Sequence, residues 1–155
     1  MEDVKPTSPA NPRPTPTPCL CAALRQASRV VTRIYNAELR GTGLRSTQHS
    51  LLRLLDRVGV VRQGDLGEIA SLDDTTLTRN LRPLQNSGWV TIRAGSDRRE
   101  KLVAVTEAGK AKLEMARPAW SRAQERMKRT LPDGMWDSLF TALPEVTKVA
   151  LGDTP

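Results

Sequence analysis

Residues 66–90 read LGEIASLDDTTLTRNLRPLQNSGWV, and this pattern predicts two short helices joined by a tight turn. Apolar side chains at helical spacing place the first helix over residues 66–71, and residues 72–73 form the turn. Asp73 is a candidate N-cap for a second helix over residues 74–87, because its carboxylate can accept from the free amides of the first turn. Leucines at every third or fourth position give that helix one buried face: Leu77, Leu81 and Leu84.

A β-hairpin with a charged tip is predicted directly after these helices. Residues 89–94 (WVTIRA) and 102–105 (LVAV) alternate and are rich in β-branched side chains, whereas GSDRREK between them is polar or charged. The order of helix, turn, helix and charged hairpin is that of a winged helix-turn-helix. We therefore expect a mainly α fold with a winged helix-turn-helix lobe and a β-hairpin wing.

Helical periodicity also predicts long helices on both sides of this lobe. The first helix runs from Cys19 to Arg40, and a second opens at Ser46-Thr47, whose hydroxyls are candidate caps. After the hairpin, Thr106 caps a helix that continues to Arg129, and a last helix has a wide apolar face. The apolar stripes of the first and last helices have no obvious partner in so short a chain. We expect them to form a dimerisation lobe with a second copy; the alternative is that they pack together within a monomer.

The chain divides into four segments on this interpretation. Six of the eleven prolines lie within residues 1–18, which predicts a disordered Pro-rich arm. Residues 19–44 form a dimerisation helix and residues 45–106 the winged helix-turn-helix region. Residues 107–152 form the C-terminal dimerisation helices.

Composition excludes several classes of protein. The net charge of +7 and the pI near 10.1 favour a polyanionic partner, whereas an aromatic content of 3% argues against a stacking platform for single strands. There is no apolar run of about 20 residues and no signal-peptide pattern, so we expect no membrane partner. Two cysteines favour a reducing, cytoplasmic compartment, and with a single histidine they are too few for a four-ligand structural zinc site, so that no such metal site and no cofactor are predicted. No paired carboxylates, phosphate loop or catalytic triad is present, which predicts no enzyme.

The second helix of residues 66–90 and the hairpin tip supply candidate contacts to double-stranded DNA. Short polar side chains and arginines lie opposite the leucine stripe, where a helix that enters the major groove needs them: Asp74, Thr75, Thr76, Thr78, Arg79 and Arg82. Arg79 is the candidate for a bidentate contact to guanine. At the tip, Arg99 is the candidate for the minor groove and Arg98 for phosphates, and the Asp97 carboxylate is expected to hold one guanidinium in position.

These residues resemble those of the MarR family of transcriptional regulators. The similarity rests on residues 66–70 and 72–90, on Asp97-Arg-Arg99, and on residues 102–109 (LVAVTEAG), and it covers about residues 20–150. The resemblance implies an obligate homodimer that binds a pseudopalindromic operator and usually represses transcription. It also implies that a small ligand or an oxidant releases the DNA.

Two cysteines at the start of the first helix are candidate redox sensors. A helix N-terminus favours the reactive thiolate, and Arg25 adds positive charge one turn beyond Cys21. Cys21 with Tyr35 is similar to the OhrR branch of the family, whose members sense organic hydroperoxides through a cysteine that becomes a sulfenic acid. Cys19 is a candidate to resolve an oxidised Cys21, or the two thiols are a candidate soft-metal site. The alternative is that both are small thiols without a switching role.

A ligand pocket is expected, from the family, between the dimer helices and the DNA-binding lobe. Tyr35, His49 and Trp120 are candidate linings, although a histidine on a helix is more often a surface or core residue. Two functions compete with the regulator. One is a thiol protein that reacts with peroxide through Cys21, and the other is a winged-helix module that binds proteins and never contacts DNA.

Overall fold

The computed structural model describes residues 18–97 and 99–152, so that residues 1–17 of the predicted arm lie outside the described residues. The elements in chain order are α1 (Leu20–Leu39), a 3-10 turn (Arg40–Thr42), α2 (Ser46–Val58), β1 (Val61–Arg62), α3 (Gln63–Ala70), α4 (Asp74–Asn86), β2 (Val90–Ala94), β3 (Lys101–Val105), α5 (Glu107–Thr130) and α6 (Met135–Ala150). The predicted mainly helical fold with a helix-turn-helix and a β-hairpin wing is confirmed.

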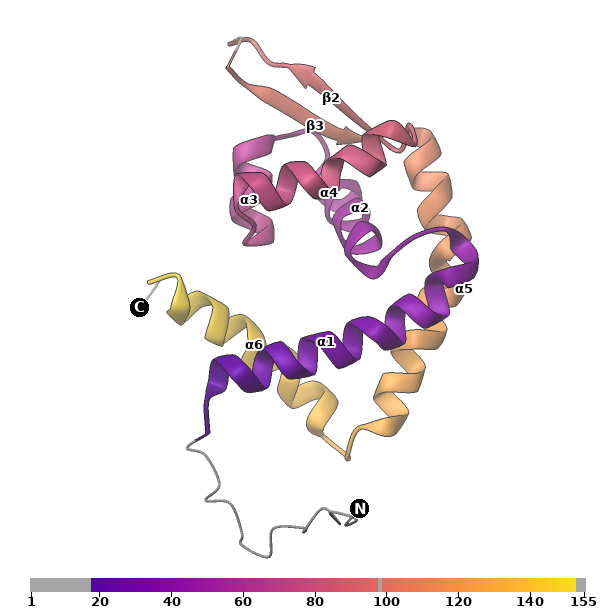
Figure 1. The fold of residues 1–155 in the computed structure, drawn as a ribbon, viewed down its shortest axis with the longest axis vertical. Helices are drawn as coiled ribbons and strands as arrows, with labels where there is room; N and C mark the ends of the chain where they lie inside the picture. Colours follow the sequence, from indigo (N-terminus) through magenta and orange to yellow (C-terminus); the bar gives the residue numbers. More distant parts are fainter. Residues whose placement is uncertain (1–17, 98, 153–155) are drawn as a thin grey trace, which may run out of the picture.

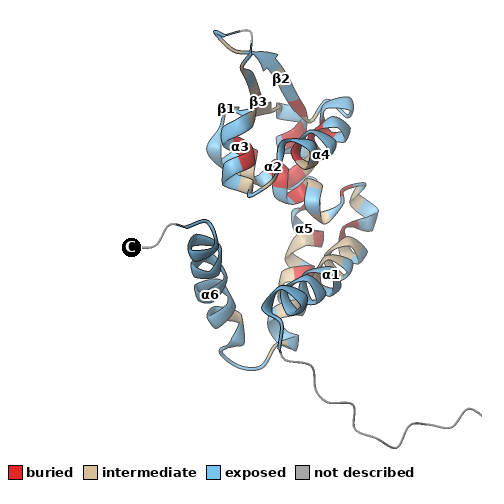
Figure 2. Ribbon diagram, turned by 60° about the vertical axis from the view of Figure 1, so that its left-hand side comes forward, coloured by how far each residue is buried: buried red, intermediate tan, exposed pale blue. Residues whose placement is uncertain are grey.

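The helices form two groups that α5 connects. Figure 1 shows α2, α3 and α4 together below the projecting hairpin, with α1 crossing the far part of α5. Most of the buried core lies in the first group, where Figure 2 shows most of the buried residues, and the end of α1 and one side of α5 complete it. Its fully buried leucines come from four helices: Leu39, Leu52, Leu55, Leu66, Leu77, Leu81 and Leu84. The predicted leucine stripe of α4 is therefore confirmed, and it fixes which face of α4 remains outside.

The sheet has three antiparallel strands in the order β1-β3-β2, and the sequence analysis missed β1. Val61 pairs with Val103, which also pairs with Ile92 on the other side. A strand of two residues is too short to show alternation, so no sequence pattern marks it. By pairing with β3, this strand joins the start of α3 to the wing.

The junction between the wing and α5 is tightly packed. The Thr106 hydroxyl donates to the carbonyl of Gly88 at 2.7 Å and accepts from the amide of Gly109 at 3.0 Å, which confirms Thr106 as an N-cap. A Cβ at Gly109 would lie 2.2 Å from the carbonyl oxygen of Trp89. Only glycine fits this position without moving the backbone.

Two helix starts differ from the prediction. Ser46 is the first residue of α2 and not its cap, because the helix begins at that residue and its amide donates to Asn36 Oδ1 at 2.7 Å. Gln48 Oε1 accepts from the amide of Arg45 at 2.9 Å and satisfies a second free donor. The helix α3 begins at Gln63, three residues before the predicted start, because the apolar stripe marks only its buried part.

The apolar stripe of the first helix was expected to have no partner within the chain, but part of it has one. The second half of α1 packs against α5 within the chain, where Glu38 lies 3.4 Å from Arg122 and 3.6 Å from Arg126. The helix α6 lies apart from the other helices in Figure 2, and none of its residues is buried. Since Leu20 at the start of α1 is also 63% exposed, the two stripes do not bury each other within one subunit. No helix in the described part of the chain is long and apolar enough to cross a bilayer.

Candidate nucleic-acid interface

The first turn of α4 is fixed by its cap. Asp73 Oδ1 accepts from the amide of Thr76 at 2.9 Å, and Asp73 Oδ2 accepts from the Thr76 hydroxyl at 2.7 Å. These hydrogen bonds lower the pKa of Asp73, so that the cap stays ionised at neutral pH. Thr76 was predicted to contact DNA, but its half-buried side chain already donates to this cap. Its main role in the free protein is to hold the helix start.

The other predicted α4 residues share the outward face of the helix. Opposite the buried leucines, five polar or charged side chains are exposed: Asp74, Thr75, Thr78, Arg79 and Arg82. Asn80 lies between the two arginines in the sequence but lines a cavity behind the helix. The structure therefore separates α4 into an exposed face and a face turned toward α1 and α2.

The tip of the wing is ordered by its backbone. The amide of Gly95 donates to the carbonyl of Glu100 at 2.9 Å, and the amide of Glu100 donates to the carbonyl of Asp97 at 2.9 Å. Asp97 Oδ1 accepts from the backbone amide of Arg99 at 3.0 Å. The Asp97 carboxylate was expected to accept a hydrogen bond from a guanidinium. From Arg99 it accepts one from the backbone amide instead. The Arg99 side chain is exposed, and Arg98 lies outside the described residues.

A cleft of about 480 Å³ brings the wing, α3 and α4 together. It contains Asp74, Thr78 and Arg99 from the prediction and adds several residues that the sequence analysis missed: Arg62, Gln63, Glu100 and Lys101. Gln63 Nε2 donates to Thr78 Oγ1 at 3.2 Å, and Arg62 Nη2 lies 3.0 Å from Glu100 Oε1. No sequence signal marked Arg62 and Gln63, because the strand β1, which pairs with β3 and brings the start of α3 to the wing, is too short to show a pattern.

The predicted redox residues do not meet within one subunit. Cys19 and Cys21 are free and exposed at the start of α1, where Cys19 is the N-cap residue without a side-chain cap bond. Tyr35 lies on the same helix, fourteen residues after Cys21, which is about 21 Å along the axis. The phenol of Tyr35 therefore does not approach the Cys21 thiol in the same chain.

His49 and Trp120 form a stacked pair between α2 and α5. Their ring centroids are 5.8 Å apart at an interplanar angle of 21°, and the Arg53 guanidinium lies 4.2 Å from the Trp120 centroid. Burial, with a contribution from the charge of Arg53, lowers the pKa of His49 to about 4. The imidazole is therefore neutral at physiological pH.

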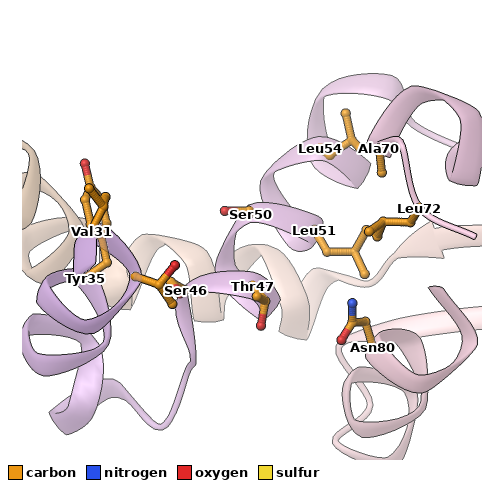
Figure 3. Close-up of a pocket in the computed structure, with 11 residues that line it drawn as sticks. Val31, Tyr35, Ser46, Thr47, Ser50, Leu51, Leu54, Ala70, Leu72 and Asn80 are labelled. Atoms are coloured by element: carbon orange, nitrogen blue, oxygen red, sulfur yellow. The ribbon is translucent and has the colours of Figure 1, made fainter. Parts of the chain in front are cut away.

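Tyr35 lies on a different cavity from the stacked pair, which divides the expected pocket in two. His49 and Trp120 line a cavity of about 330 Å³ on the α2–α5 side. Tyr35 lines one of about 470 Å³, bounded by α1, α2 and the α3–α4 segment (Figure 3). Within one subunit the structure therefore does not bring all three residues to one cavity.

The sequence of the winged helix-turn-helix matches a known family. Residues 44–101 match the profile described as the MarR family. Two curated relatives from Bacillus subtilis (strain 168) are similar: YwoH at 34% identity over 91 residues and YdgJ at 30% over 87 residues, both described as uncharacterised HTH-type transcriptional regulators. Residues 44–101 therefore form a MarR-family domain. The matches to the two relatives cover 59% and 56% of this chain, and 66% and 53% of the relatives' lengths.

A solved structure extends the likeness beyond the matched region. The M. tuberculosis transcriptional regulator MosR, in a crystal structure in complex with DNA, is 29% identical with a TM-score of 0.78. The alignment covers 89% of this chain and 100% of MosR. MarR-family members are transcription regulators and not enzymes, which confirms the prediction that the chain has no catalytic function.

Proposed function

We propose that this MarR-family chain is a homodimeric DNA-binding transcriptional repressor that a small ligand or an oxidant releases from its operator. The observation that carries the proposal is the shared cleft of α4 and the wing, where Thr78 and Arg99 lie together beside the exposed face of α4. A helix that enters the major groove and a hairpin that reaches the neighbouring groove need this arrangement. The DNA complex of the similar protein MosR supports the same choice of partner.

The roles of the individual side chains follow from their positions. Arg79 is exposed in the middle of α4 and is assigned to a guanine edge, with Thr75 and Thr78 nearer the start of the helix. Arg82, one turn later, is assigned to phosphates, and Arg99 to the minor groove. Because phosphate contacts release counterions, the binding affinity should fall steeply as salt is added.

The dimer is proposed from the exposed apolar side chains of the terminal helices. On α6, Phe140 and Val149 are each 62% exposed, and Leu20 on α1 is 63% exposed. Large apolar side chains exposed in this number mark an interface, and a two-fold axis would bury the same side chains of both copies. We expect Phe140→Asp to yield monomers in light scattering, whereas Thr141→Asp on the polar side of α6 should leave the dimer intact.

Selection of bound duplexes from a random library tests the proposed operator. We expect an inverted repeat whose half-sites lie about 10 base pairs apart from centre to centre, since a two-fold dimer sets its α4 helices one helical turn apart. Enrichment of a single half-site, or of no sequence, would refute the dimeric mode. A transcription assay with the selected site placed over a promoter then tests repression. Increased transcription would mean that the protein is an activator and not a repressor.

Variants of the cysteines distinguish release of DNA by an oxidant from release by a ligand. If an oxidant acts through Cys21, hydroperoxide should release DNA from the wild type and not from Cys21→Ser. Equal release from both proteins would remove Cys21 from the mechanism. Cys19→Ser tests separately whether Cys19 resolves an oxidised Cys21, because Cys19 is also exposed at the start of the same helix.

A further inference from the structure

An ion pair joins the start of α3 to the tip of the wing. Arg62 ends β1 and is the N-cap residue of α3, and its Nη2 atom lies 3.0 Å from Oε1 of Glu100. In the sheet Arg62 pairs with Leu102, which is the contact of β1 with β3 nearest the tip, and Glu100 directly precedes β3. The ion pair therefore extends the contact between β1 and the wing beyond the two residues of that strand.

The backbone around Glu100 determines where its side chain lies. The Glu100 amide donates to the carbonyl of Asp97, and the Glu100 carbonyl accepts from the amide of Gly95, both at 2.9 Å. A Cβ at Gly95 would lie 2.8 Å from both Cβ and Oε2 of Glu100. Glycine at this position therefore leaves the space that the Glu100 side chain occupies beside Arg62.

The residue after Arg62 contacts the proposed DNA-binding helix. Gln63 Nε2 donates to Thr78 Oγ1 in α4 at 3.2 Å. Two consecutive side chains thus contact the wing and α4, one each. Figure 1 shows the hairpin of β2 and β3 projecting beyond α3 and α4, so that contacts near its base set the direction in which its tip points.

The charge of Glu100 needs a compensating benefit if the wing binds DNA. Glu100 lines the same cleft as Thr78 and Arg99, where a carboxylate would repel the phosphates of a duplex. Because the Arg62 side chain is 60% exposed, its ion pair with Glu100 adds little to the stability of the fold. The remaining contribution of the pair is to the orientation of the wing.

We propose that Glu100 is a positioning residue for DNA binding, whose ion pair with Arg62 holds the wing at the angle to α4 that lets Arg99 and α4 enter adjacent grooves together. This inference rests on the proposed function, because the angle matters only if both elements bind one duplex. Without the pair, Arg99 is still present but the wing samples more directions. Ordering the wing then costs conformational entropy when DNA binds.

Removal of the Glu100 side chain distinguishes positioning from charge. Glu100→Ala takes one negative charge per subunit from the proposed DNA surface, so charge alone predicts tighter binding. We expect operator affinity to fall by about threefold to tenfold instead, since a weak ion pair is lost from each of two wings. Affinity equal to or higher than that of the wild type would overturn the proposal.

Asp65→Ala is the matched control for the charge. It removes the same charge from the same cleft, but Asp65 forms no ion pair with the residues that the structure describes. The control should bind the operator more tightly than the wild type. If Asp65→Ala weakened binding as much as Glu100→Ala, loss of a carboxylate from the cleft and not loss of the ion pair would be responsible, and the proposal would be overturned.

Exchange of the two charges tests the ion pair itself. The double variant Arg62→Glu with Glu100→Arg restores a pair of opposite charges and carries one positive charge less per subunit than Glu100→Ala. We nevertheless expect the double variant to bind the operator more tightly than Glu100→Ala. Affinity equal to or lower than that of Glu100→Ala would exclude the pair as the cause.

A double-mutant cycle with Arg99 tests whether Glu100 acts through the wing. Arg99→Ala should weaken operator binding in the wild type, and the further loss that it causes in the Glu100→Ala background should be at least three times smaller as a fold-change. The same fold-change in both backgrounds would overturn the action through Arg99.

Residual dipolar couplings of the backbone amides measure the orientation of the wing in the full chain without DNA. In the wild type, the couplings of β2, β3 and α4 should fit one common alignment, whereas those of the hairpin should be scaled down in Glu100→Ala. Unchanged couplings would overturn the positioning role. If the wild type binds no duplex while the couplings change as expected, the proposed function fails, and the effect of the ion pair on the wing stands.

Discussion

The Asp97 carboxylate accepts a hydrogen bond from the backbone amide of Arg99 at 3.0 Å and thereby shapes the tip of the wing. Its partner is the main chain, so the Arg99 guanidinium stays exposed and free to reach a ligand. Aspartate side chains commonly close turns in this way, two residues before the donor. The acidic residue of the tip therefore serves the geometry of the turn, although its charge opposes an anionic partner.

Two neutral substitutions at Asp97 separate geometry from charge. Asp97→Asn keeps an oxygen that can accept from the Arg99 amide, whereas Asp97→Ala removes the acceptor. Because both remove the same charge, we expect the alanine variant to bind operator DNA several times more weakly than the asparagine variant. Fluorescence anisotropy on one duplex measures the difference, and equal affinities would show that the turn bond has no role in binding.

Arg79→Ala should reduce the free energy of operator binding by about 1–3 kcal/mol and relax the base preference at one position of each half-site. The matched control is Arg82→Ala, which removes the same charge three residues away on the same exposed face. The control should weaken all duplexes about equally. Competition binding across single-base variants of the operator measures both effects, and a uniform loss for Arg79→Ala would leave it only a phosphate contact.

Stability should depend on pH through His49. The folded protein holds its pKa at about 4, against 6.5 in an unfolded chain, so between these values the unfolded state binds the extra proton. The unfolding free energy should therefore fall as the pH drops from 6.5 to 4, by up to about 3 kcal/mol. The chain has one histidine, so His49→Phe should flatten this part of the profile in urea unfolding. Parallel profiles for the two proteins would contradict the burial of a neutral imidazole.

Gly109→Ala should destabilise the protein by about 2 kcal/mol or more, because its Cβ would lie 2.2 Å from the Trp89 carbonyl oxygen. Gly64 is the control, since a Cβ at this helical position meets no atom within 4 Å. Gly64→Ala should leave stability unchanged or raise it by up to about 1 kcal/mol. Thermal or urea unfolding distinguishes the two variants. Equal stability would mean that the backbone at the contact of Gly109 with Trp89 shifts at little energetic cost.

The elements that could be predicted from the sequence are those with a local signal. The leucine stripe of α4, the Asp73 cap and the Thr106 cap each lie within a few residues of the structure that they specify. The strand β1 and the Asn36–Ser46 bond could not be predicted, because each joins residues that are far apart in the sequence. Both depend on tertiary contacts, which the local sequence pattern does not show.

The candidate site divides in the same way. The exposed face of α4 followed from the position of its buried face, so that Arg79 and Arg82 could be placed in advance. Gln63 could not be placed, because its contact with Thr78 depends on the turn between β1 and α3. The place of Asn80 could not be predicted either, since sequence spacing does not show that a cavity lies behind α4.

The salt dependence of DNA binding tests the central claim that α4 and the wing of a two-fold dimer bind double-stranded DNA. The logarithm of the binding constant should fall linearly with the logarithm of the salt concentration, with a slope of about −0.9 for each neutralised phosphate. Arg82→Ala removes one proposed phosphate contact from each subunit and should make the slope shallower by about 2, whereas Lys128→Ala at the far end of α5 should not change it. No affinity for any duplex at low ionic strength, or the same slope in all three proteins, would contradict the claim.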